Sequence, residues 1–340
     1  MDVKNAVKAL KDVSPALAKD GVLPVLTHYC FDGGGVYAYN DVLAMRRPIS
    51  GFDGFEGAVS KDIMKVLSAS TQDASVEVSR HNLTVKSGRS KATLSFLGPE
   101  EFLFEQPDLS GLEPIRVGQD LMWGLEYAMK SVDQKSRDTA INAVVISVDT
   151  IASTDNISLT RWMLDERLPI DGPTTESSGS IVVPAPFIKH LLDWCNNDCD
   201  LYLTGEHCTA LFDDGSMLFT KVLTSEVLDF DGIIDSYHNP YDEYAVSVNN
   251  SVISRLKYVK QLVPDAHVVL GDGTITITGH NSSAEIEEVF DVEYSGRRVV
   301  FDMEVNSLIR AFEMSDEAFF NEGCLSTFIG DKLLHLALYK

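Results

Sequence analysis

Long apolar stretches are missing from this sequence. Its apolar runs, such as the "AVVI" of residues 143–146, are the size of a β-strand, whereas a membrane-spanning helix needs eighteen or more apolar residues in a row. The first residues, "MDVKNAVKALKDV", alternate apolar and lysine-bearing positions and lack the apolar core of a signal peptide. We therefore expect a cytoplasmic protein that does not enter a membrane.

Cysteine is scarce, and its number is odd. Of the five cysteines, only Cys195, Cys199 and Cys208 lie close together, with His207 beside them. This cluster leaves a zinc site open as one interpretation. The Cys-x3-Cys spacing is unusual for zinc, however, and Cys195 falls in the apolar stripe of "FIKHLLDWC", so we favour reduced thiols that pack as small apolar side chains. We expect no metal and no cofactor.

Motifs of catalysis are also absent. The sequence has no nucleophile elbow, no phosphate-binding loop and no histidines at metal-ligand spacing. The glycine-rich "DGGG" of residues 32–35 is not followed by a helix pattern, so it predicts a turn between two strands. An enzyme would need a convergent set of reactive groups, and we predict that this protein is not one.

Basic residues are few in this chain of net charge −23, which has 28 Lys and Arg against 51 Asp and Glu. Such a balance argues at first sight against nucleic-acid binding, because that binding depends on basic groups that meet phosphates. It would suit an acidic mimic of DNA or an inhibitory binding protein. The position of the basic residues decides the question, and several of them gather in "TVKSGRSKATLSFLGPEEF", residues 84–102.

Internal similarity indicates a repeated domain. "YNDVLAMRR" and "STDNISLTR" share one pattern, with Asp41 and Asp155 at equivalent places 114 residues apart. A helical pattern of apolar, basic, any and apolar residues occurs around Lys65, Lys189 and Arg310, at spacings of 124 and 121 residues. A period near 120 in 340 residues predicts three copies of one domain.

Each copy has the pattern helix, strands, helix, strands. Apolar residues at helical spacing predict helices over 3–17, 61–68, 119–132, 185–194, 251–263 and 304–314. Alternating segments such as "SVEVSRHNLTVKSGRSKATLSFL" predict antiparallel strands between them. The fold class is therefore α+β, with two helices packed on antiparallel sheets in each copy. Proline-rich and polar segments place the domains at 1–110, 111–236 and 237–340.

Several segments, in this order and spacing, resemble the bacterial DNA sliding clamp, the β subunit of the replicative polymerase. They are "SGRSKATLSFLGPEEF", "ASTDNISL", "SMLFTKVLTSEVLDFDGII" and "AEIEEVFDVEYSGRRVVFDMEVNSLIRAF". The resemblance implies a non-catalytic processivity factor, a head-to-tail homodimeric ring that encircles double-stranded DNA without reading its sequence. DNA polymerase and clamp loader are the implied protein partners, through short peptide motifs. The ending "LLHLALYK" lacks the family's Met-Pro-Met, and Gly-His-Arg is absent after Asp155, which indicates a divergent member and leaves a viral origin open.

The predicted helices carry much of the basic inventory, and on a clamp they would line the hole. The predicted DNA-lining residues are Lys4, Lys8, Lys11, Lys61, Lys65, Lys130, Lys189, Arg255, Lys257, Lys260 and Arg310. A positive lumen holds duplex without base contacts, and an acidic exterior repels stray DNA. The alternative is that these residues are only the solvated face of amphipathic helices.

Ring size gives a geometric check on the number of chains. Helices that pack about 8 to 10 Å apart would, with six from one chain, leave a hole of about 8 Å, too narrow for duplex DNA. Twelve helices from two chains would leave at least about 25 Å. The fold therefore favours a dimer, although composition alone does not exclude a ring of three chains.

The basic strand of residues 84–102 suits the junction between chains, because an unpaired strand edge needs a partner. We predict a dimer interface in which Arg89 and Lys91, with apolar Ala92 and Leu94, face Glu285, Glu287 and Glu288 of "SAEIEEVFD". The alternative is that these charges only protect an exposed edge from aggregation.

The resemblance also implies a pocket that receives apolar side chains of partner peptides. The matching positions are Ile141, Thr154, Asn156, Ile157, Leu159, Leu334, Leu336 and Leu338. Because alternate residues of a strand must be buried somewhere, the other interpretation is that some of these side chains belong to the ordinary core.

Overall fold

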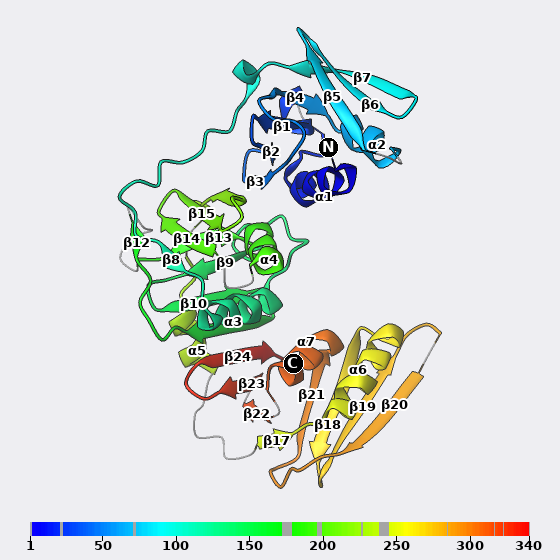
Figure 1. Cartoon of the computed structure of the whole chain (residues 1–340). Coiled ribbons are helices and arrows are strands. Elements are labelled where there is room, and N and C mark those ends of the chain that lie inside the picture. The colour runs from blue at the N-terminus through cyan, green and yellow to red at the C-terminus, as the bar shows by residue number, and fades with distance from the viewer. Residues whose placement is uncertain are drawn as a thin grey trace. The chain divides into compact units, whose positions relative to one another are not determined.

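The computed structural model describes residues 2–20, 23–70, 73–171, 179–195, 199–225, 227–237, 245–283, 285–315, 317–321 and 323–339. The chain forms two compact units (Figure 1). Unit 1 comprises Met1–Gly118, Pro169–Pro173 and Lys189–Val222, and unit 2 comprises Gln119–Leu168, Thr174–Ile188 and Leu223–Lys340.

Unit 1 is built on one large sheet with helices on it. Its helices are α1 (Val3–Val13), α2 (Asp62–Ser68) and the last part of α4 (Ala185–Trp194). Its strands are β1 (His28–Asp32), β2 (Gly35–Tyr39), β3 (Leu43–Pro48), β4 (Glu56–Ser60), β5 (Ala74–Ser79), β6 (Asn82–Ser87), β7 (Ser90–Leu97), β8 (Ile115–Arg116), β12 (Ile170–Asp171), β14 (Cys199–Thr204), β15 (His207–Phe212) and β16 (Met217–Lys221).

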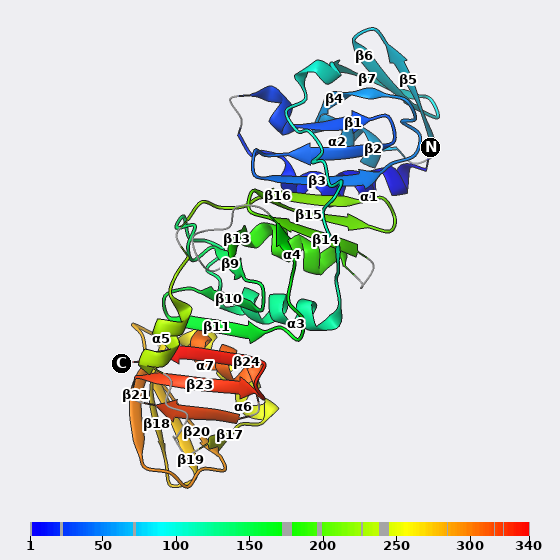
Figure 2. The same cartoon turned by 90° about the vertical axis from the view of Figure 1, so that its left-hand side faces the viewer.

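The sheet of unit 1 joins segments that are far apart in the chain. Its order is β12-β14-β15-β16-β3-β2-β1-β4-β7-β6-β5, with β8 paired to β14. The pairing of β16 with β3, visible in Figure 2, sets Met217 opposite Arg46. Arg47 supports this pairing, because its guanidinium donates to Asp214 at 3.1 Å and to Ser216 at 2.9 Å.

Helix α1 shows how the sequence determines a local element. The side chain of Asp2 caps the helix by accepting hydrogen bonds from the backbone N–H groups of Lys4 and Asn5. Ala6, Leu10 and other apolar residues at helical spacing are buried, and the helix packs on β2 and β3 (Figure 2). Its lysines are left on the solvent side.

Unit 2 contains two antiparallel sheets. Its helices are the first part of α4, α3 (Gln119–Ala128), α5 (Phe230–Tyr237), α6 (Asn250–Leu262) and α7 (Val305–Met314). Its strands are β9 (Ala143–Ile146), β10 (Thr150–Thr154), β11 (Ser158–Met163), β13 (Ile181–Pro184), β17 (Ala245–Ser247), β18 (Asp265–Gly271), β19 (Thr274–His280), β20 (Glu285–Asp291), β21 (Val299–Glu304), β22 (Glu317–Asn321), β23 (Cys324–Ile329) and β24 (Leu333–Leu338).

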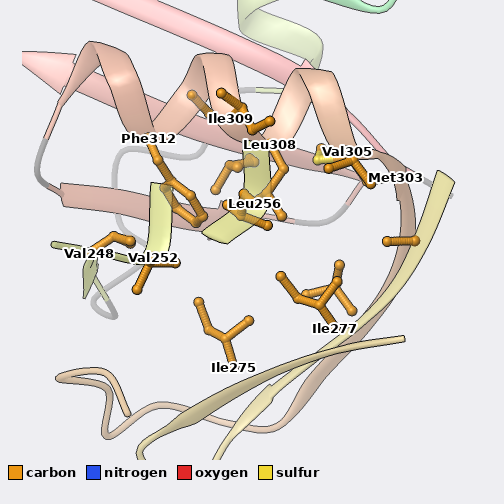
Figure 3. Close-up of a cluster of buried hydrophobic side chains, with 14 of the residues drawn as sticks. Val248, Val252, Leu256, Ile275, Ile277, Met303, Val305, Leu308, Ile309 and Phe312 are labelled. Atoms are coloured by element: carbon orange, nitrogen blue, oxygen red, sulfur yellow. The ribbon is translucent and has the colours of Figure 1, made fainter. Parts of the chain in front are cut away.

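The larger sheet of unit 2 has the order β13-β9-β10-β11-β24-β23-β22-β17, and the smaller has the order β20-β19-β18-β21. In the larger sheet, β11 pairs with β24, the last strand of the chain, and Leu159 lies opposite Leu336. Figure 3 shows the core between the helices and the smaller sheet, where Leu256 of α6 and Leu308 and Phe312 of α7 point toward Ile275 and Ile277 of β19.

The predicted fold class is confirmed, since antiparallel sheets carry helices at each of the six predicted places. Among the described strands, only β12 and β14 pair in parallel. Helix α5 lies where no helix was predicted. The predicted domain boundaries stay a prediction, and residues 238–244, just after the second boundary, lie outside the described part of the chain.

Candidate functional site

Most of the basic residues predicted to line DNA are exposed side chains of helices. The exposed ones are Lys4, Lys8 and Lys11 of α1, Lys61 and Lys65 at α2, Lys189 of α4, and Arg255, Lys257 and Lys260 of α6. In α1 they lie on the side opposite the buried apolar residues. The structure thus leaves these cations accessible to a ligand in solution.

Some of these exposed cations have acidic neighbours. Lys65 pairs with Asp62 at 2.7 Å, Lys257 with Glu313 at 2.6 Å, and Arg255 with Glu288 at 2.7 Å. Exposed ion pairs of this kind contribute little to stability. A phosphate can therefore replace the carboxylate at small cost.

Arg310 and Lys130 differ from the other predicted residues because they are partly buried. The Arg310 guanidinium pairs with Asp155 and donates to the Lys130 carbonyl oxygen at 2.9 Å. The Lys130 ammonium lies 4.8 Å from the centre of the Tyr127 ring, and burial lowers its pKa. Arg310 is therefore engaged inside unit 2, unlike the exposed cations predicted to line DNA.

The partner of Arg310 organises the β10–β11 turn. Asp155 accepts hydrogen bonds from the backbone N–H groups of Ile157 at 3.1 Å and Ser158 at 2.7 Å. Burial alone would raise the pKa of Asp155, but the Arg310 guanidinium and the hydrogen bonds from Ser158 lower it below its usual range. Asn156 has a φ of 69°, a left-handed conformation that asparagine tolerates. The turn presents Ile157 to solvent with 44% of its surface exposed.

A buried polar cluster lies beneath this turn. The Nδ1 atom of His335 on β24 is 2.9 Å from the Thr160 hydroxyl and 3.4 Å from that of Ser131. Burial, together with the nearby Arg310 charge, lowers the pKa of His335 to about 3. A neutral imidazole therefore stands beside the Arg310 guanidinium.

A pocket of about 660 Å³ opens beside Ile157. Its lining residues are Asn156, Ile157, Tyr237, Asp265, Asp302, Met303, Glu304, Gly323, Leu338 and Tyr339. Three of these, Asn156, Ile157 and Leu338, belong to the predicted partner pocket. Tyr237 and Tyr339 also line the pocket, and the sequence analysis did not predict them. The only signal for them in the sequence is that each is an aromatic residue, one near the second domain boundary and one at the end of the last strand.

The other residues predicted for that pocket are buried. Leu159, Leu334 and Leu336 form one cluster with Ile234 of the unpredicted helix α5. Ile141 and Thr154 are buried as well. The sequence left open whether these side chains line a pocket or belong to the ordinary core. In the structure they are buried in the core.

Helix α5 is fixed to the sheet near both ends. At its N-terminal end, Asp231 pairs with Arg161 of β11 at 2.8 Å. At its C-terminal end, the Cys324 thiol donates to the Tyr237 carbonyl oxygen at 3.2 Å. A second pocket, of about 760 Å³, lies at the N-terminal end of α5 and is lined by residues that include Val145, Phe230 and Asp231. The helix therefore separates two openings in unit 2.

The two predicted halves of the dimer interface lie on strand edges. In unit 1, β7 pairs with β6, and it pairs with β4 only at Phe96 and Leu97, so its other edge at residues 90–95 has no described partner. Arg89 and Lys91 are exposed, and Ala92 and Leu94 are half-buried.

In unit 2, β20 is the outer strand of the smaller sheet. Glu285 and Glu287 are exposed on one face, whereas Glu288 points to the other face and pairs with Arg255 of α6. Two of the three predicted carboxylates are thus available at that edge.

The described residues contain no group of three or more His, Cys, Asp or Glu side chains that could hold a metal. The Sγ atoms of Cys195 and Cys199 are 3.1 Å apart, and all five cysteines are buried thiols. In the same part of the chain, no helix is long and apolar enough to cross a membrane.

Solved structures of the same fold cover nearly the whole chain. DNA polymerase III subunit beta from Pseudomonas aeruginosa matches with a TM-score of 0.81 and 17% identity over 100% of this chain and 98% of its own. The Helicobacter pylori beta clamp bound to a DNA ligase peptide matches with a TM-score of 0.84 and 13% identity, over 99% of this chain and 98% of its own. The Thermotoga maritima beta subunit matches with a TM-score of 0.79 and 14% identity, over 99% of this chain and 97% of its own.

No family model matches this sequence, and neither does any curated protein. The likeness to bacterial DNA polymerase III beta subunits is therefore one of structure, at low identity, and it extends over both units. The chain has the three-domain fold of the bacterial sliding clamps.

Proposed function

We propose that this protein is a DNA sliding clamp, a processivity factor that encircles duplex DNA and tethers a DNA polymerase to its template. One observation carries the proposal: the match to bacterial beta subunits covers 100% of this chain and 98% of the Pseudomonas aeruginosa chain. Nothing in this role needs catalysis, a cofactor or a membrane, and we place the protein in the cytoplasm.

The exposed cations of the helices support binding to duplex DNA. Lys8, Lys65, Lys189 and Lys257 are accessible and belong to helices of all three repeats. Contacts from lysine to phosphate position DNA without reading its sequence. An acidic mimic of DNA, which the net charge of −23 would also suit, has no need of lysines at repeated places on its helices.

The open edges of β7 and β20 support a head-to-tail homodimer. One edge carries Arg89 and Lys91, and the other carries Glu285 and Glu287, so pairing them would satisfy backbone groups and bring opposite charges together. Repeated at both ends of two chains, the same contact closes a ring. We propose the pocket beside Ile157 as the site for partner peptides, since the Helicobacter pylori structure of this fold holds a DNA ligase peptide.

Topological retention on DNA tests the proposal without a clamp loader. A duplex is fixed to beads at one end, the protein is allowed to thread over the free end, and that end is then blocked with a bulky protein. A clamp stays on the beads through a wash at high salt, which removes electrostatic binders, and leaves when a restriction cut reopens the end. Release at high salt with the end still blocked would contradict the proposal.

Two sets of variants locate the contacts. Glutamate at Lys8, Lys65, Lys189 and Lys257 should reduce threading strongly, whereas glutamate at Lys19, Lys135, Arg167 and Arg298, exposed cations off the helices, should change it little. Both sets alter the net charge equally. Equal losses in the two sets would show that total charge, and not the helix faces, governs binding.

The interface is tested by light scattering over a dilution series. The protein should have the mass of a dimer, and the variant with Arg89→Glu, Lys91→Glu and Leu94→Asp should be a monomer that no longer stays on blocked DNA. A variant that remains dimeric at micromolar concentration would show that this edge is not the interface.

A further inference from the structure

The pocket beside Ile157 combines an apolar centre with an acidic side. Ile157, Leu338 and Tyr339 contribute apolar surface, whereas Asp265, Asp302 and Glu304 contribute carboxylates. No lysine, arginine or histidine belongs to its described lining. A ligand that fills this pocket would therefore place its apolar group next to several negative charges.

The three carboxylates lie on one face of two paired strands. Asp265 of β18 is directly opposite Glu304 of β21, and His267 is opposite Asp302. Residues opposite each other in an antiparallel pair point to the same face, and like charges in that position repel. This face is also the outer one, because the alternating residues Ala266 and Met303 are buried.

Little in the described structure offsets that repulsion. His267 Nδ1 lies 2.8 Å from Asp302 Oδ1, and the Ser307 hydroxyl donates to Glu304 at 3.2 Å. Asp265 is exposed and has no ion pair with a described residue. A cation supplied by a ligand would relieve the repulsion between Asp265 and Glu304.

The acidic face continues beyond the pocket. A neighbouring pocket of about 320 Å³ shares Asp265 and Asp302 and extends to Glu285, with His267 and His280 also in its lining. An extended segment seated at Ile157 can therefore continue past Asp265 and Asp302 toward a third carboxylate. Both pockets consist of described residues of unit 2 alone.

We propose that the partner segment bound at this site carries large apolar anchors next to one or two basic residues. This inference rests on the proposed function, which makes the pocket a peptide site, and it adds the charge of the peptide. The apolar anchors provide most of the binding energy by filling the pocket at Ile157 and Leu338. The basic residues select the partner, because they meet Asp265 and Glu304, whereas an acidic segment is repelled there.

Three labelled synthetic peptides test the inference by fluorescence anisotropy with the full-length protein. Each contains the same Leu-Phe core, which is followed by two lysines, two serines or two glutamates. The lysine peptide should bind about tenfold more tightly than the serine peptide, the sum of two modest ion pairs, and the glutamate peptide should bind most weakly. The differences should shrink between about 50 mM and about 300 mM salt because of screening.

Variants assign the preference to residues. The double variant Asp265→Asn and Glu304→Gln should bind the lysine and serine peptides equally, with the affinity for the serine peptide unchanged. The matched control Glu126→Gln and Glu166→Gln, exposed carboxylates outside the pocket, should keep the tenfold preference. Ile157→Ser should weaken all three peptides.

Equal binding of the lysine and serine peptides to the unaltered protein would overturn the inference, as would loss of the preference in the control variant or no binding of any peptide. The bead assay does not depend on the pocket. A protein that is retained on blocked DNA but shows no charge preference disproves only this inference, whereas one that prefers the lysine peptide but is not retained disproves the clamp function.

Discussion

Lowering the pH should destabilise unit 2 through His335. The imidazole is completely buried, and its pKa is lowered from 6.5 to about 3 by burial and by the Arg310 charge. The other charged groups near it are Asp155 and Lys130. The unfolded chain accepts the proton near pH 6.5, whereas the folded one does not, so the contribution to stability is complete above about pH 7 and falls as the pH decreases.

The size of the effect follows from the two pKa values. Between pH 7 and pH 5 the unfolded histidine becomes almost fully protonated, while the folded one, with a pKa of about 3, stays neutral. The free energy of unfolding should therefore decrease by about 2 kcal/mol from this residue alone. The variant His335→Asn keeps a polar group near Thr160 and Ser131 but cannot take up the proton.

Urea unfolding at pH 7 and pH 5, followed by tryptophan fluorescence, measures the difference. A Trp194→Phe background leaves Trp123 and Trp162, both in unit 2, as reporters. From pH 7 to pH 5, the free energy of unfolding should decrease by about 2 kcal/mol more in the parent than in the His335→Asn variant. The control variant His81→Asn, changed at an exposed position, should show the same decrease as the parent. Equal losses with and without His335 would refute the reasoning.

Three further changes have defined outcomes. Arg310→Met should lower the free energy of unfolding by about 3 kcal/mol in urea melts, because it leaves the buried Asp155 carboxylate without its cation; an unchanged midpoint would contradict this. Gly124→Ala should cost about 1 kcal/mol net by the same measurement, since the added Cβ would lie 2.8 Å from Trp162 Cδ1 and overpacking outweighs the gain in helix propensity. Cys208 should resist iodoacetamide in the folded protein, because burial raises its pKa; rapid alkylation seen by mass spectrometry would show that the strand opens.

The predicted helices matched the structure best where the sequence pattern is local and complete. Helix α1 has its capping residue Asp2 and buried residues at helical spacing within one short segment. Helix α5 was missed because its segment contains a glycine and several acids that suggest a linker, and it is held by distant groups, Arg161 and Cys324. Contacts between residues 70 or more positions apart have no local signal in the sequence.

The partner site was predictable only in part for the same reason. The turn that carries Ile157 belongs to a motif in the sequence, and that residue does line the pocket. The sequence pattern around Leu334 and Leu336 predicts a strand but does not say whether these side chains line a pocket or are buried. Only their contact with Ile234 of α5 shows that they belong to the core. Asp265 and Glu304 stand 39 positions apart in the sequence, and only the pairing of β18 with β21 sets them opposite each other.

The sequence by itself determined the α+β class, the period near 120 residues and the basic faces of the helices, because each follows from spacing along the chain. The tertiary structure alone decided which charges are exposed to solvent. Lys65 and Arg310 occupy equivalent places in the repeated pattern, yet Lys65 is exposed while Arg310 is tied to Asp155 and the Lys130 carbonyl. The physical reason is that the environment of a charge depends on the groups that folding brings around it, and those groups come from other parts of the chain.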